Sequence, residues 1–129
     1  MQLALVPNTD TFPTADSVER PDRTAWRFVI DGRPLRDGEL LVWFRVPLER
    51  PTFKSGRTTI TTCGLCGHEG CGALAALVAQ VGDEVVWSDF AYETPHDEPT
   101  ALDIAETRFP RSDDESVMRL LPRPAATWA

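Results

Sequence analysis

Short apolar stretches rich in β-branched and aromatic residues alternate with turn-forming residues along most of the chain. Stretches of this kind at 2–6, 25–30, 40–46 and 57–62 predict β-strands. The stretch 40–46 is apolar on both faces apart from Arg45, which is typical of a central strand. Asp-Gly pairs, which favour tight turns, occur at 31–32 and 37–38.

The segment from Ala73 to Gln80 is ambiguous between helix and strand. It is rich in alanine and leucine, and intrinsic propensity alone favours a helix. However, Gly82-Asp83 is a turn pair, and the alternating residues 84–90 after it predict a strand. A hairpin that joins 74–81 to 84–90 explains both halves, so we expect two strands here. A last strand is expected over 104–109.

The C-terminal part of the chain predicts one helix. Ser112 followed by Glu115 matches a capping box, with the serine as N-cap. Acidic residues in this first turn suit the positive end of a helix dipole. Val117, Leu120 and Leu121 supply an apolar face, and a proline follows directly. We therefore expect a helix that ends near Leu121.

The fold class that follows is α+β: a mainly antiparallel β-sheet with a Cys-rich knuckle and one C-terminal helix. A chain of 129 residues is expected to form a single domain, 1–129. Residues 8–24 are rich in Thr, Pro, Asp and Arg and predict a loop or mobile arm, and 122–129 predict a frayed tail.

The charge of the chain restricts its partners. It carries 13 basic and 20 acidic residues, a net charge of −7, which disfavours binding to nucleic acid and to anionic membranes. A basic protein partner is compatible with this charge. The N-terminus lacks the features of a signal peptide, and no apolar stretch approaches the roughly 20 residues of a membrane span. We therefore expect a cytoplasmic protein.

The most distinctive stretch is 61–72, which contains all three cysteines. The spacing is Cys63-x2-Cys66-x-His68-x2-Cys71. A turn between two cysteines that are two residues apart directs both sulfurs toward one ion, and sulfur and imidazole ligands favour zinc. Four glycines let the backbone curl around such an ion: Gly64, Gly67, Gly70 and Gly72.

The fourth ligand can come from either of two histidines. His68 is local, but four ligands within nine residues crowd the loop. His96 lies in the loop after the predicted hairpin and can reach the site from across the sheet. We predict a zinc site of Cys63, Cys66, Cys71 and His96, with His68 as the alternative fourth ligand.

Several other interpretations of the cysteines stay open. The three thiols can be metal-free and purely structural, or Cys63 and Cys66 can form a redox pair. Haem attachment requires a histidine directly after the second cysteine, and Gly67 stands there instead. No Gly-x-Ser-x-Gly elbow and no phosphate-binding loop occurs, so no catalytic or cofactor-binding residue beyond the zinc ligands is predicted.

Part of the chain also resembles a known group of proteins. The pattern Cys-Gly-x-x-Gly-Cys, then a turn with Asp, then Val-x-Trp-Ser-Asp-Phe and Pro-His, is similar to that of a family of uncharacterised small bacterial proteins. The resemblance covers about half the chain and implies the hairpin and His96 as ligand, but no activity. This chain has its first cysteine three residues before Cys66, where those relatives have it two before. The matching residues are Cys66–Cys71, Gly82-Asp83, Val85–Phe90 and Pro95-His96.

The function predicted from these features is a small zinc-binding module that acts by protein–protein contacts, as an immunity or accessory protein. The alternatives are an enzyme with an open zinc site or reactive thiols, and a metal-free structural domain. A zinc ion with four protein ligands leaves no position for substrate, so a closed site favours the non-enzymatic interpretation.

Overall fold

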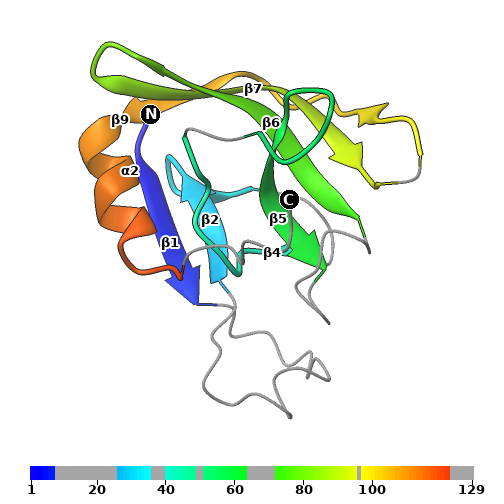
Figure 1. The fold of residues 1–129 in the computed structure, drawn as a ribbon. Helices are drawn as coiled ribbons and strands as arrows, with labels where there is room; N and C mark the ends of the chain where they lie inside the picture. Colours follow the sequence, from blue (N-terminus) through cyan, green and yellow to red (C-terminus); the bar gives the residue numbers. More distant parts are fainter. Residues whose placement is uncertain (8–25, 36–39, 49–50, 64–71, 96, 123–129) are drawn as a thin grey trace.

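The computed structural model describes residues 1–7, 26–35, 40–48, 51–63, 72–95 and 97–122 (Figure 1). The predicted arm at 8–24, the second Asp-Gly turn at 37–38 and the tail after Pro122 lie outside these residues. The elements are β1 (Leu3–Pro7), β2 (Trp26–Ile30), β3 (Arg33–Pro34), β4 (Leu40–Leu41), β5 (Thr58–Cys63), β6 (Ala73–Val81), β7 (Glu84–Glu93), β8 (Thr100–Ala101), β9 (Thr107–Pro110) and α2 (Arg111–Met118).

The strands form two antiparallel sheets. The smaller sheet has the order β1-β2-β3. The larger has the order β4-β5-β6-β7-β8, and β9 also pairs with β7. A single bridge between Trp26 and Val42 connects the two sheets in the described part of the chain. The helix α2 packs against β1, β7 and β9 at one side of the molecule (Figure 1). The predicted α+β class, with a mainly antiparallel sheet and a C-terminal helix, is confirmed.

Two of the predicted tight turns are present. Asp31 and Gly32 have φ angles of 52° and 79° and join β2 to β3, as expected of an Asp-Gly hairpin turn. Gly82, with a φ of 60°, joins β6 to β7, and Val81 pairs with Glu84 on either side of the turn. The segment 73–81 is therefore a strand, because this turn folds it onto β7.

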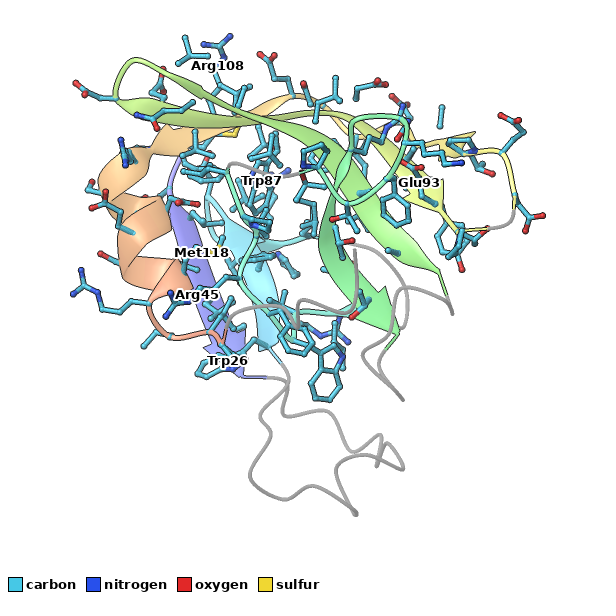
Figure 2. The ribbon with its side chains drawn as sticks, viewed as in Figure 1. Trp26, Arg45, Trp87, Glu93, Arg108 and Met118 are labelled. Carbon is cyan, nitrogen blue, oxygen red and sulfur yellow. The ribbon has the colours of Figure 1, made fainter. Side chains whose placement is uncertain are left out.

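The core lies between the two sheets and is centred on Trp87 of β7 (Figure 2). The Trp87 side chain is fully buried. Its ring lies 5.1 Å from that of Phe28 in the small sheet and 4.9 Å from that of Phe109 in β9, in edge-to-face geometry that aromatic pairs prefer. The other buried side chains of this cluster are Leu3, Val42, Val46, Ile60, Leu74, Ala76, Val85, Phe90, Val117, Met118 and Leu121.

The prediction of a central strand over 40–46 is wrong. Only Leu40–Leu41 form a strand, and it lies at the end of the large sheet. Further along, the backbone N–H of Arg45 donates to the carbonyl of Pro122 at 2.9 Å, and its side-chain Nε donates to the carbonyl of Leu121. The apolar residues of this segment are buried by packing against other elements. The apolar residues on both faces of the segment 40–46 are therefore not evidence for a strand that is paired on both sides.

The predicted cap of the helix is also wrong. The helix begins at Arg111, directly after Pro110, and no side chain caps it. Ser112 lies inside the helix, so it cannot be the N-cap. Tertiary contacts fix this end instead: the N–H of Arg111 donates to the carbonyl of Asp83 at 2.8 Å. Leu120, expected on the apolar face, is 59% exposed because the regular helix has already ended at Met118.

Two further predictions differ from the structure. The loop expected after the predicted hairpin contains the end of β7 and the short strand β8, which pairs with Ala91 and Tyr92. The last strand, expected at 104–109, is β9 at Thr107–Pro110. No helix in the described residues has the length and apolar character needed to cross a bilayer.

Asp114, in the first turn of α2, lies on the buried face of the helix. Its side chain is 5% exposed, and its Oδ1 has no hydrogen-bond partner among the described residues. Burial raises the pKa of Asp114 from 3.8 to about 6, with a further increase from the nearby charge of Glu115 and an opposing effect from Arg111. The native state therefore keeps Asp114 protonated to a higher pH than the unfolded chain does.

This burial predicts a pH-dependent gain in stability for Asp114→Asn. Between pH 4 and 6 the native state of the wild type holds the Asp114 proton more tightly than the unfolded state. Its free energy of unfolding therefore falls as the pH rises through this window. We expect Asp114→Asn to be more stable than the wild type by about 1–2 kcal/mol at pH 7 and nearly equal to it at pH 4. Urea unfolding at both pH values measures this difference. The exposed Glu98→Gln serves as the control, and an equal effect of Asp114→Asn at both pH values would contradict the prediction.

Candidate metal centre

The ends of three neighbouring strands lie in one row at one end of the large sheet. Thr62, one residue before the end of β5, pairs with Ala73 at the start of β6, and Ala73 pairs with Glu93 at the end of β7. Adjacent strands are about 4.8 Å apart, so this row is only about 10 Å wide. The connection 64–71 therefore starts from β5 and ends at the adjacent strand β6. The chain that leads to residue 96 starts from β7, the next strand of the sheet (Figure 1).

Of the predicted ligands, only Cys63 lies within the described residues. It is the last residue of β5 and pairs with Leu40 of β4. Cys66, Cys71, His96 and the alternative ligand His68 lie outside the described part of the chain. Within that part there is no group of three His, Cys, Asp or Glu residues that could hold a metal ion. The coordination itself therefore stays a prediction.

The end of the cysteine stretch has a well-defined backbone position at Gly72. This residue is buried and has a φ of 104°, in the region that favours glycine. A Cβ atom at this position would overlap the hydroxyl and ring of Tyr92 on β7. Glycine is thus required here both for the backbone conformation and for the close approach of the tyrosine ring. The chain re-enters the sheet in a fixed position.

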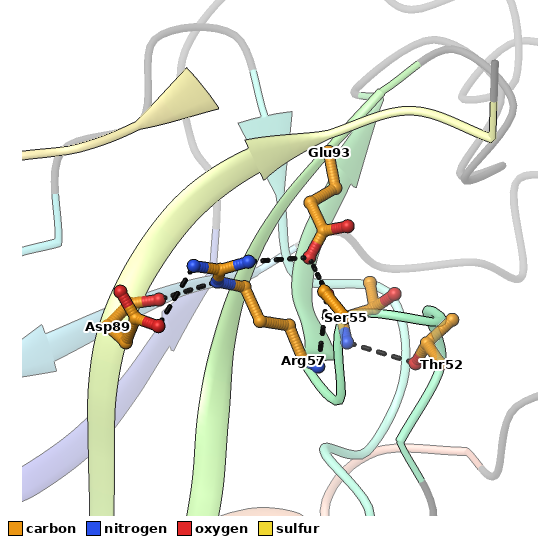
Figure 3. Close-up of polar contacts among 6 residues, drawn as sticks. Thr52, Ser55, Arg57, Asp89 and Glu93 are labelled. Carbon is orange, nitrogen blue, oxygen red and sulfur yellow. Dashed lines mark hydrogen bonds and ion pairs between the residues drawn. The ribbon is translucent and has the colours of Figure 1, made fainter. Parts of the chain in front are cut away.

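Arg57 lies at the start of β5, at the opposite end of that strand from this row, and its side chain links the chain before β5 to strand β7 (Figure 3). Its Nε donates to the carbonyl of Asp89 at 2.7 Å, and its Nη2 donates to the Asp89 carboxylate at 2.9 Å. Its Nη1 lies 3.5 Å from the carboxylate of Glu93. Since β6 lies between β5 and β7, the arginine side chain spans β6. The residues of β6 and β7 on that face, Ala73, Ala75 and Ala91, are small and fully buried, which leaves room for it.

Glu93 is held by a second contact from the same loop. Its side chain is 5% exposed, and its carboxylate accepts a hydrogen bond of 2.6 Å from the hydroxyl of Ser55. The same hydroxyl accepts a bond from the backbone N–H of Arg57 at 3.3 Å. Burial of a carboxylate is unfavourable unless it is paired and hydrogen-bonded in this way. Glu93 therefore anchors the end of β7 through its contacts with Ser55 and Arg57. This anchor is close to the point where the chain continues to residue 96.

An irregularity in β7 makes the contact with Arg57 geometrically feasible. Ala75 pairs with Ala91, whereas Leu77 pairs with Ser88, so two residues of β7 lie opposite one residue of β6. Asp89 is one of these two and has a φ of 52°. An extra residue in a left-handed conformation is typical of a β-bulge, which bends the strand and redirects its carbonyl. Here the redirected carbonyl of Asp89 accepts from Arg57.

Sequence reasoning missed this cluster of Ser55, Arg57, Asp89 and Glu93. The arginine and the glutamate are far apart in the sequence, and neither belongs to a recognisable pattern. The signal that could have indicated their contact is the register of the 74–81 and 84–90 hairpin, together with the neighbouring strand 57–62. The bulge at Asp89 shifts that register by one residue, and the sequence does not mark it with glycine.

Comparisons with protein-family models, with curated proteins and with solved structures found no match to this chain. The likeness to small bacterial proteins noted from the cysteine pattern therefore stays a prediction.

Proposed function

We propose that the protein is a small zinc-binding module in which Cys63, Cys66, Cys71 and His96 hold one ion at the end of the large sheet. His68 is the alternative fourth ligand. The main support is the row of strand ends, since both ends of the cysteine stretch and the chain that leads to His96 start from adjacent strands. Ligands that start about 5–10 Å apart can meet at one ion with metal–ligand distances of about 2.0–2.3 Å.

The described residues next to the row fit the role of a support for such an ion. Gly72 and Tyr92 fix the chain where it re-enters the sheet, and the Ser55–Arg57–Glu93 cluster fixes the end of β7. The buried hydroxyls of Thr61 and Thr62 have no partner among the described residues. Hydroxyls beside a metal-bound cysteine can donate to its sulfur, a contact that stabilises metal thiolates.

The proposed mode of action is by protein contacts rather than by catalysis. A site of three cysteines and one histidine has four protein ligands and therefore leaves no open position for a substrate or a reactive water. Glu93, a buried acid at the end of the row, is bonded to Ser55 and Arg57 and is not free to act as a general base. An immunity or accessory protein of the cytoplasm, with a basic partner that suits the net charge of −7, is consistent with these features.

The proposal predicts about one zinc ion per chain in the purified, untagged protein. His96→Ala is expected to lose most of the bound zinc, because the three cysteines alone leave one coordination position without a protein ligand. His68→Ala is expected to keep it and serves as the matched control. Elemental analysis of the three proteins, normalised to chain concentration, gives the result directly.

Thiol labelling under native conditions separates the remaining alternatives. Zinc-bound cysteines are expected to react slowly with an alkylating reagent until a chelator is added. A protein without zinc whose three thiols react at the rate of free cysteine would contradict the proposal. Loss of zinc in His68→Ala but not in His96→Ala would replace the predicted fourth ligand by the local one.

A further inference from the structure

Helix α2 covers the outer edge of β1. In the small sheet, of order β1-β2-β3, β1 is the end strand and pairs with β2 on one side. On its other side the backbone N–H of Leu3 donates to the carboxylate of Asp113 in α2 at 3.0 Å. The helix therefore stands where a further strand would otherwise pair, and it protects the end of the small sheet (Figure 1).

The register of β1 shows which of its backbone groups depend on this cover. Gln2 faces the β2 side, because its carbonyl accepts from the N–H of Asp31 at 2.9 Å and its N–H donates to Oδ1 of Asp31 at 2.7 Å. Alternate residues of an antiparallel strand direct their N–H and C=O groups to opposite neighbours. The groups of Ala4 are therefore directed to β2, and those of Leu3 and Leu5 to the edge beside α2.

The face of α2 that is buried includes an acid. Asp114 shares this face with Val117 and Met118, three and four residues further along the helix. Oδ1 of Asp114 is buried and has no hydrogen-bond partner among the described residues. A charged carboxylate without a partner is unfavourable in such a place, whereas a neutral carboxyl is tolerated much better. The contact between the helix and the sheet is thus sensitive to the protonation of this one group.

The surroundings of Asp114 offer its charge little compensation. Nε of Arg111, one turn earlier on the helix, lies 3.1 Å from the carboxylate of Glu115, and both of these side chains are exposed. The cation is therefore shared with another acid. The other charged groups on α2 near Asp114 and on the elements packed against it are the amino group of Met1, Asp83, Glu84, Arg108 and Asp113. Three of these are acids, and Arg108 is exposed and paired with Glu106.

We propose that Asp114 is a proton-dependent switch at the contact between α2 and β1. Its neutral carboxyl keeps the helix closed over the edge of β1, and its ionisation favours an opened contact in which water reaches the carboxylate. Burial raises the pKa of Asp114 from 3.8 to about 6. The closed contact is therefore most favoured below pH 4, and this preference is lost as the pH rises through about 6.

The opening is local, because α2 is fastened elsewhere at both ends. At its start the N–H of Arg111 donates to the carbonyl of Asp83 at 2.8 Å. At its end Sδ of Met118 accepts from the N–H of Val46 at 3.4 Å. Neither contact involves β1, so the helix and β1 can separate while the helix keeps these anchors. The opened contact frees the backbone groups of Leu3 and Leu5. The proposal does not depend on the zinc site.

Hydrogen exchange of single backbone amides, measured by NMR at pH 5 and pH 7 and divided by the intrinsic rate at each pH, tests the switch. The opening constant at the Leu3 N–H is expected to rise by about three- to tenfold between these pH values. The N–H groups of Ala4, directed to β2, and Arg111, bonded to Asp83, are internal controls and are expected to change by less than about twofold.

Three variants assign the effect to Asp114. Asp114→Asn cannot ionise and is expected to abolish the rise at Leu3. The exposed Glu98→Gln is expected to keep it. Asp113→Asn retains a side-chain oxygen that can accept from Leu3, and is also expected to keep it.

Three results would overturn the proposal. The first is an opening constant at Leu3 that is equal at both pH values, or a rise that persists in Asp114→Asn. The second is a rise that is lost in Asp113→Asn, which would assign the pH dependence to the direct contact with Leu3. The third is an equal rise at Leu3, Ala4 and Arg111, which would show unfolding of the whole domain rather than a local opening.

Discussion

Replacement of Trp87 by alanine is expected to lower the free energy of unfolding by about 3–5 kcal/mol, the largest effect of any single substitution proposed for this protein. Trp87 is fully buried at the centre of β7 and contacts Phe28 in the small sheet and Phe109 in β9. The truncation would leave a large cavity where the two sheets meet, and the surrounding rings cannot close it without moving both sheets.

The measurement is urea unfolding followed by far-ultraviolet circular dichroism, which does not depend on the tryptophan signal. Trp87→Phe is the matched control, because it keeps a buried ring. It also removes the indole N–H, which has no hydrogen-bond partner among the described residues. We expect it to cost about 1–2 kcal/mol. A loss of less than about 1 kcal/mol in Trp87→Ala would show that the two sheets do not depend on this contact.

The second largest effect is expected at Arg57. Arg57→Ala removes the cation that faces the buried carboxylate of Glu93 and breaks both bonds to Asp89. The removal of one partner of a buried ion pair leaves an uncompensated charge, which costs about 3–5 kcal/mol in fully buried cases. Because the Asp89 side chain is 57% exposed and the Arg57 side chain is 13% exposed, we expect a loss of about 2–3 kcal/mol here.

Two further variants determine which half of the cluster matters. Asp89→Asn affects only the exposed ion pair and is expected to cost less than about 1 kcal/mol. Glu93→Gln in the Arg57→Ala background is expected to recover part of the loss, because the buried side chain is then neutral. If Arg57→Ala and Asp89→Asn have equal effects, the buried contact to Glu93 contributes nothing.

The parts of the fold that local sequence determines could be predicted. Asp31-Gly32 and Gly82-Asp83 are turn pairs whose glycines adopt positive φ angles, and they place β2 beside β3 and β6 beside β7. The turn at Gly82-Asp83 correctly predicted that the ambiguous segment 73–80 is a strand. A hairpin pairs this segment with β7, whereas helix propensity is only a weak local preference.

The parts that depend on tertiary contacts could not be predicted. Val42 and Val46 are buried because they pack into the core, not because they belong to a strand with two neighbours. The helix starts at Arg111, where Asp83 accepts its first N–H, although a capping pattern stands one residue later. In the sequence Asp114 resembles a solvated acid of a first helical turn, yet the packing of α2 buries it.

The candidate site could also be predicted from the sequence only in part. The spacing of the cysteines identifies the stretch that carries the proposed chemistry, and the strand register adds that its two ends and the chain toward His96 start from one row. The supporting cluster around Arg57 was not predictable, because it depends on a bulge in β7 that places Asp89 within reach. Only the assembled sheet brings these residues together.

The most direct test of the zinc site is X-ray absorption spectroscopy at the zinc edge on the purified wild-type protein. The proposal predicts one zinc ion with three sulfur ligands at about 2.3 Å and one nitrogen ligand at about 2.0–2.1 Å. A protein that binds no zinc, or a zinc ion surrounded only by oxygen and nitrogen, would contradict it.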